Sequence, residues 1–233
     1  MNARELVIAV VSELGLALTL AGLVYRDRAR ALRSFTVYVS VVFLGELSVL
    51  LLPSVFWTWN WWVARQTVYS SLKLAIGAEL ATSLFVPFPG ARRTAGLATL
   101  TFLVATLVLL GFVYQATPMG GLSRELFAGQ LLPRLGNGAL GVFLGLTAVA
   151  RWYLVPLRPF FKAVLSGFVA YGVVTVVMTA LLDLSYDPVR NVFNIVAGMG
   201  YCALTSWWAF SAFTAREPDP ARTPLLAALE ARC

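Results

Sequence analysis

Long apolar runs, each bounded by charged or turn-forming residues, occupy most of this chain. A helix needs about 20 mostly apolar residues to cross a bilayer, and such runs lie at about 5–25, 35–55, 65–86, 94–114, 127–150, 160–182 and 190–213. The pattern therefore predicts an all-α integral membrane protein, a bundle of seven transmembrane helices over residues 1–214. Residues 215–233 are predicted to form a cytoplasmic tail, in which Thr223 and Pro224 begin one short helix.

The composition agrees with this prediction and removes most enzyme chemistry. Hydrophobic residues make up 59% of the 233 residues and charged residues 12%, whereas soluble domains carry about 25% charged residues. Histidine is absent from the sequence, which excludes bis-histidine haem ligation, the usual zinc sites and a Ser-His-Asp triad. The sequence shows no metal-binding cluster and no paired nucleophile and base. We therefore predict that the protein is not an enzyme and has no metal and no cofactor.

Basic residues predict the orientation, because Lys and Arg are enriched in cytoplasmic loops. The side reached after the first, third and fifth spans carries, together with the tail, twelve basic residues, whereas the opposite side carries four. This asymmetry predicts an N-terminus outside and a C-terminus in the cytoplasm. The net charge of +7 is then a topology signal and an attraction to anionic lipid headgroups, and not a sign of nucleic-acid binding.

Tryptophans gather in the predicted outer loop between the second and third spans. They are Trp57, Trp59, Trp61 and Trp62. Trp is typical of membrane interfaces, so an aromatic belt is one interpretation. A ligand-binding aromatic surface is the other.

A weak internal repeat relates the first three spans to the last three. An offset of 125 residues aligns them without a gap, so that Arg26 meets Arg151 and Phe35 meets Phe160. Transporters often contain such repeats. The alignment predicts a possible arrangement of three helices, one linking helix and three further helices.

Ionisable side chains inside the predicted spans are candidates for function, because a charge in the hydrocarbon region is costly. Counting about 1.5 Å per residue places four of them in one layer, roughly 10 to 14 Å below the outer surface. The layer comprises Glu13, Glu46, Lys73 and Arg134, with Asn137 and Tyr171 at a similar depth. Two interpretations stay open: an ion-pair network that fixes the bundle, or a polar cavity that binds a small charged solute or passes an ion.

Glu79 lies deeper on the predicted third span, six residues after Lys73 and about 120° around the helix. A buried carboxyl without a basic partner favours its neutral, protonated form. One interpretation is a proton-coupling group of a transporter or a switch. The other is a protonated side chain that bonds a backbone carbonyl, a Ser or a Thr.

The predicted fifth span contains several residues that weaken helices. Pro133, Gly136 and Gly138 predict a break or kink near Arg134, and discontinuous helices line binding sites in transporters. Gly141 and Gly145 form a GxxxG pattern, which favours close helix packing.

A resemblance to known proteins rests on the order of several residues along the chain. These are Arg33 and Phe35, the tryptophan loop, and then Tyr69, Glu79, Arg92 and Arg93. In this order the chain resembles seven-helix bacterial inner-membrane proteins that have no assigned activity, and it is loosely similar to the membrane sensor modules of bacterial histidine kinases. It departs from those kinases because it ends at Cys233 without a kinase domain, and no functional residue is carried over.

Together these features predict a non-catalytic accessory or sensor subunit in the bacterial inner membrane. It would act through helix packing with a membrane protein partner or with a second copy of itself. The alternative is a small-solute or proton-coupled transporter that uses the outer charge layer and Glu79.

Overall fold

The computed structural model describes residues 3–84, 132–152, 157–184 and 188–215. Within these ranges the chain forms helices and no strand, so the all-α prediction is confirmed. The helices are α1 (Ala3–Tyr25), α2 (Arg33–Leu51), the one-turn α3 (Pro53–Phe56), α4 (Trp59–Leu84), α7 (Leu132–Trp152), α8 (Pro159–Leu184) and α9 (Pro188–Thr214). The predicted span at 94–114 and the tail helix at Thr223 lie outside the described residues.

Three of the described helices are long and apolar enough to cross a membrane. These segments are Leu6–Tyr25, Arg33–Leu51 and Pro159–Met178. On α1, Leu14 and Leu18 are exposed while Leu16 and Leu23 are fully buried, so the face turned away from the bundle is itself apolar. Such helices are those of a membrane-associated protein in contact with lipid.

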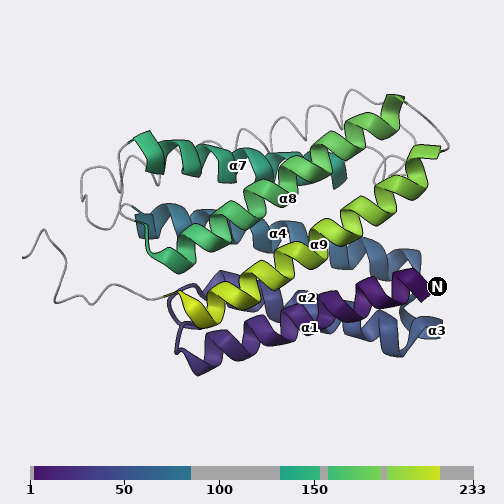
Figure 1. Cartoon of the computed structure of the whole chain (residues 1–233), viewed down its shortest axis with the longest axis horizontal. Coiled ribbons are helices and arrows are strands. Elements are labelled where there is room, and N and C mark those ends of the chain that lie inside the picture. The colour runs from purple at the N-terminus through teal and green to yellow at the C-terminus, as the bar shows by residue number, and fades with distance from the viewer. Residues whose placement is uncertain (1–2, 85–131, 153–156, 185–187, 216–233) are drawn as a thin grey trace, which may run out of the picture.

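The helices form a closed chain of contacts, in which α1 touches α2, α2 touches α4, α4 touches α7, α7 touches α8, α8 touches α9 and α9 touches α1. They all run along the long axis of the molecule (Figure 1). The first residues of α1 lie at one end, called here the N-terminal end. The opposite end, where α1 and α9 finish, is called the basic end. It carries Arg26, Arg28, Arg30, Arg33, Arg151, Arg158 and Lys162.

Glycines let α1 and α9 approach each other closely. A Cβ atom on Gly15 would lie 2.6 Å from Oγ1 of Thr205, and one on Gly22 would lie 2.8 Å from Cβ of Ala212. Because residue numbers rise together on both helices, α1 and α9 run parallel. The sequence also predicted close packing at Gly141 and Gly145. A Cβ on Gly145 would meet no atom of the described residues within 4 Å, so that packing stays a prediction.

Aromatic rings fill the bundle in its half nearest the basic end. Phe35 and Trp208, both fully buried, meet edge to face with ring centroids 5.1 Å apart. Phe168 lies 4.8 Å from Trp208 and stacks on Phe143 at 4.6 Å. These four residues are called here the aromatic core. Such ring pairs each add about 0.5 to 1.5 kcal/mol beyond area burial.

The helix α4 begins six residues earlier than the sequence predicted, at Trp59 instead of 65. Trp59 and Trp62 stack with ring centroids 4.9 Å apart, so these tryptophans and Trp61 belong to the first turns of a helix and not to a loop. Trp57 lies between α3 and α4 and is exposed. The earlier start shifts every depth expected along this helix.

The end of α1 is closed by a Schellman motif, which turns the chain toward α2. The backbone N–H of Arg28 donates to the carbonyl of Leu23 at 2.8 Å, and that of Asp27 donates to the carbonyl of Val24 at 3.1 Å. Asp27 adopts a left-handed conformation with φ of 52°. This conformation is strained for a residue with a Cβ atom, whereas glycine adopts it freely.

Replacing Asp27 with glycine should therefore stabilise the protein. We expect Asp27→Gly to raise the free energy of unfolding by about 0.5 to 1 kcal/mol, which is roughly 1 to 4 °C in Tm. Thermal unfolding in mild detergent measures this, and Asp27→Asn, which also tolerates the left-handed region, should change less. A lower Tm for Asp27→Gly would show that the Asp27 side chain contributes more than its backbone costs.

Candidate functional site

An ion pair between α2 and α4 lies in the half of the bundle nearest the N-terminal end. Nη1 of Arg65 donates to Oε2 of Glu46 at 2.9 Å. The Arg65 side chain is 13% exposed and that of Glu46 is 37% exposed. The sequence placed Arg65 at the outer edge of the predicted third span, among the four basic residues of the outer side, and did not identify it as a partner of Glu46.

Glu13 on α1 lies level with this ion pair. It precedes the last residue of α1 by 12 positions, and Glu46 follows the first residue of α2 by 13, so in an antiparallel hairpin the two are at one height. Glu13 interacts electrostatically with the like-charged Glu46. It is only 8% exposed, and its Oε2 atom is buried without a hydrogen-bond partner among the described residues.

Three tyrosines lie at about the height of these charged groups or within two turns of it. Tyr69 donates its hydroxyl to the carbonyl of Val42 at 3.3 Å, and Tyr171 and Tyr201 form a pair with ring centroids 5.8 Å apart. All three interact electrostatically with Glu46. We call the set of Glu13, Glu46, Arg65, Tyr69, Tyr171 and Tyr201 the polar layer. Tyr38, 6.4 Å from Tyr69 between ring centroids, lies about 12 Å nearer the basic end than Glu46 and packs against the aromatic core.

The polar layer only partly matches the predicted charge layer. It brings Glu13, Glu46 and Tyr171 together, as predicted. Lys73 instead lies eight residues beyond Arg65 on α4, about 12 Å nearer the basic end, because α4 begins earlier than expected. Within the described part of the chain Lys73 makes no ion pair. The side chains of Arg134 and Asn137 lie outside the described residues.

Glu79 accepts hydrogen bonds from backbone N–H groups. The sequence suggested instead a proton-coupling group, or a protonated side chain bonded to a backbone carbonyl, a Ser or a Thr. Oε1 of Glu79 accepts from the backbone N–H of Arg33 at 2.9 Å, and its Oε2 accepts from that of Ser34 at 2.7 Å. These are the first two residues of α2, whose N-cap residue, Leu32, supplies no side-chain cap. A carboxylate is favoured there because the helix N-terminus carries free N–H groups and partial positive charge. Glu79 thus caps α2 from α4, at the basic end.

The sequence predicted a break in the fifth span near Arg134, but the helix is not interrupted there. Helix α7 runs continuously from Leu132 to Trp152, through Pro133, Gly136 and Gly138. Pro133 and both glycines are therefore compatible with a continuous helix over the described part of this span. The residues of the predicted span before 132 lie outside the described part of the chain.

A second buried charge, Arg28, joins α1 to the end of α9 and was missed by sequence reasoning. Its Nη1 atom donates to the carbonyls of Ser211 at 3.1 Å and Ala212 at 2.8 Å, and Nη2 donates to that of Ala215. The guanidinium also lies over the Phe160 ring, 5.6 Å from its centroid. Arg28 is only 6% exposed. We call this contact the Arg28 cap, since it satisfies carbonyls at a helix C-terminus.

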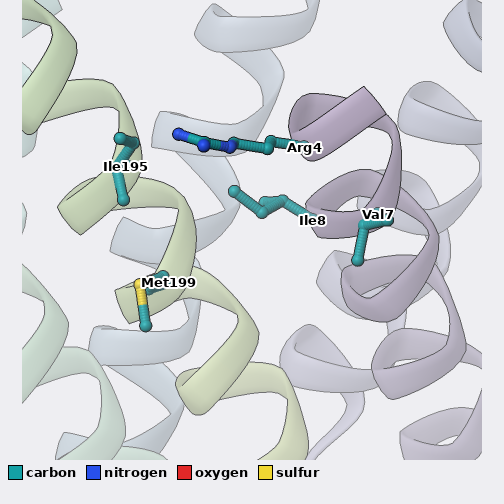
Figure 2. Close-up of a pocket in the computed structure, with 5 residues that line it drawn as sticks. All are labelled: Arg4, Val7, Ile8, Ile195 and Met199. Atoms are coloured by element: carbon teal, nitrogen blue, oxygen red, sulfur yellow. The ribbon is translucent and has the colours of Figure 1, made fainter. Parts of the chain in front are cut away.

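A cavity of about 430 Å³ separates the first turns of α1 from α9. It is lined by Arg4, Val7, Ile8, Ile195 and Met199. Figure 2 shows Arg4 and Ile8 extending from α1 toward α9. Apart from Arg4 the lining residues are apolar, so the cavity offers no ligand for a cationic solute.

The described residues contain no group of three or more His, Cys, Asp and Glu that would hold a metal ion. Comparison with protein-family models, with curated proteins and with solved structures gives no match. A functional assignment for this protein therefore rests on the geometry of the polar layer.

Proposed function

We propose that this protein is a non-catalytic sensor subunit of the bacterial inner membrane. It spans the membrane seven times with its N-terminus outside, and the basic end faces the cytoplasm. The polar layer binds a small charged solute from the outside. The resulting change in helix contacts is read by a membrane protein partner or by a second copy of the chain.

The observation that carries this proposal is the division of the bundle into two unlike halves. The outer half holds the polar layer, in which Glu13 has an oxygen left unsatisfied by the described residues and more than a third of the Glu46 side chain is accessible. The inner half is filled by the aromatic core and tied by the Arg28 cap and by Glu79. A polar site with an accessible carboxylate, next to a half that is filled by packed rings, favours binding and signalling over passage.

The test compares response with flux in the full chain, reconstituted in lipid vesicles. Spin labels at the exposed Arg30 and Thr214 report distances at the basic end, while Na⁺, methylammonium and glycine serve as probes. We expect at least one probe to change the distances without entering the vesicles. Glu46→Gln should abolish the change and Asp27→Asn, which removes an exposed carboxylate, should retain it. Probe uptake would overturn the sensor function in favour of transport.

A small-solute or proton-coupled transporter is the second candidate, and the repeat favours it. The offset of 125 residues maps α1 onto α7, α2 onto α8 and α4 onto α9. Under this mapping the contact of α1 with α9 corresponds to the contact of α7 with α4, as a twofold relation between the two repeats requires. Phe35 also meets its own counterpart, Phe160, with ring centroids 5.8 Å apart. In this candidate the capping bonds of Glu79 favour a structural role for it over proton coupling.

A further inference from the structure

The charges of the polar layer do not balance. Glu13 and Glu46 supply two carboxylates at one height, and Arg65 supplies one guanidinium, which Glu46 binds. Fully ionised, the three groups leave one negative charge. Buried charges are tolerated when they are paired, and the described residues supply no second cation to this layer.

The carboxylate without a counter-charge among the described residues is Glu13 and not Glu46. Glu13 is more than nine-tenths buried, and no donor of the described residues reaches its Oε2 atom. Among the described residues, Glu13 interacts electrostatically with Glu46 and Tyr69, neither of which is a cation. Lys73 does not fill the gap, since it lies about 12 Å nearer the basic end.

We propose that Glu13 and Glu46 together bind one compact monovalent cation in the polar layer. This names the ligand class of the site and rests on the proposed function. Hard cations such as Na⁺ prefer oxygen ligands, and the site offers the free Oε2 of Glu13, the second carboxylate oxygen of Glu46 and nearby tyrosine hydroxyls. One unit of charge neutralises the layer, whereas a divalent ion would leave an excess positive charge.

A proton on Glu13 explains the structure less well. It would cancel the charge, but whichever oxygen carries the proton, Oε2 would still have no hydrogen-bond partner in the described structure. A bound cation satisfies the same oxygen directly. The accessible part of the Glu46 side chain lets the ion reach the site.

The test is thermal unfolding of the full chain in mild detergent at constant ionic strength, with N-methylglucamine chloride replaced by NaCl, KCl or methylammonium chloride. At a concentration ten times its Kd, a bound cation should raise Tm by roughly 3 to 6 °C. Glu13→Gln should remove this shift, and Asp27→Asn should keep it. In N-methylglucamine alone, Glu13→Gln should be more stable than the natural chain, because it removes an unpaired buried charge.

The three salts identify the occupant: a shift with Na⁺ or K⁺ indicates an alkali-ion site, and a shift with methylammonium indicates an organic ammonium. A shift that survives in Glu13→Gln, or no shift with any of these salts, overturns the proposal. Stabilisation by acid alone that Glu13→Gln removes also overturns it, in favour of a proton. Spin-label distances recorded on the same samples separate the two proposals: a Tm shift with constant distances leaves the cation site and removes the sensor function.

Discussion

Arg28→Met should lower the free energy of unfolding by about 3 kcal/mol, since hydrogen bonds to charged groups contribute about 1.5 to 3 kcal/mol each. That corresponds to a fall in Tm of roughly 6 to 12 °C for a chain of this size. The guanidinium is buried and donates to three carbonyls at the C-terminal end of α9. Methionine keeps much of the apolar length over Phe160 but removes these charged donors. The carbonyl of Ser211 keeps the backbone N–H of Ala215, whereas those of Ala212 and Ala215 lose the donor that Arg28 gives them, which is the costly outcome.

Arg30→Met is the matched control, because it removes the same charge two positions away from an exposed side chain. Its effect should stay within about 0.5 kcal/mol, as for most surface substitutions. Arg28→Lys should fall between the two, since one ammonium cannot copy the planar fork of a guanidinium. Thermal unfolding in mild detergent measures all three. Equal Tm values for Arg28→Met and Arg30→Met would show that the cap adds nothing to stability.

The helices were predictable wherever an apolar run decides the outcome. The predicted first and sixth spans, 5–25 and 160–182, agree closely with α1 and α8, because burial in lipid requires long apolar helices. The start of α4 was not predictable from hydropathy alone. Tryptophans are as typical of a membrane interface as of a helix, and reading them as a loop displaced the expected depth of Lys73 by two turns.

The partners of the charged residues were harder to predict than the helices. Spacing along one helix gives height but not the neighbouring face, so Glu13 and Glu46 were placed in one layer while Arg65 was missed. Arg28 was read as one more cytoplasmic arginine, although the Arg26-Asp27-Arg28 turn folds it back onto α9. A short basic turn directly after an apolar helix was the available signal. For Glu79, nothing along α4 itself shows that the N-terminus of α2 lies opposite.

The ion pair between Glu46 and Arg65 should give non-additive effects on stability. Arg65→Met leaves Glu46 beside Glu13 without a counter-charge and should cost about 2 kcal/mol, below the range for breaking a fully buried pair because Glu46 is partly exposed. Glu46→Gln should cost less, about 1 kcal/mol, because the same change relieves the repulsion with Glu13.

The double variant should therefore be more stable than the sum of the single effects predicts, with a coupling of about 1 to 2 kcal/mol. Glu46→Gln combined with Lys73→Met is the matched control, since Lys73 shares α4 with Arg65 but makes no ion pair within the described chain; those effects should add within about 0.5 kcal/mol. Denaturant or thermal unfolding of the single and double variants and the natural chain gives both cycles. Additivity in the Arg65 cycle would remove the ion pair as a stabilising contact. A larger cost for Glu46→Gln than for Arg65→Met would contradict the repulsion between the two carboxylates, and with it the cation site proposed at Glu13.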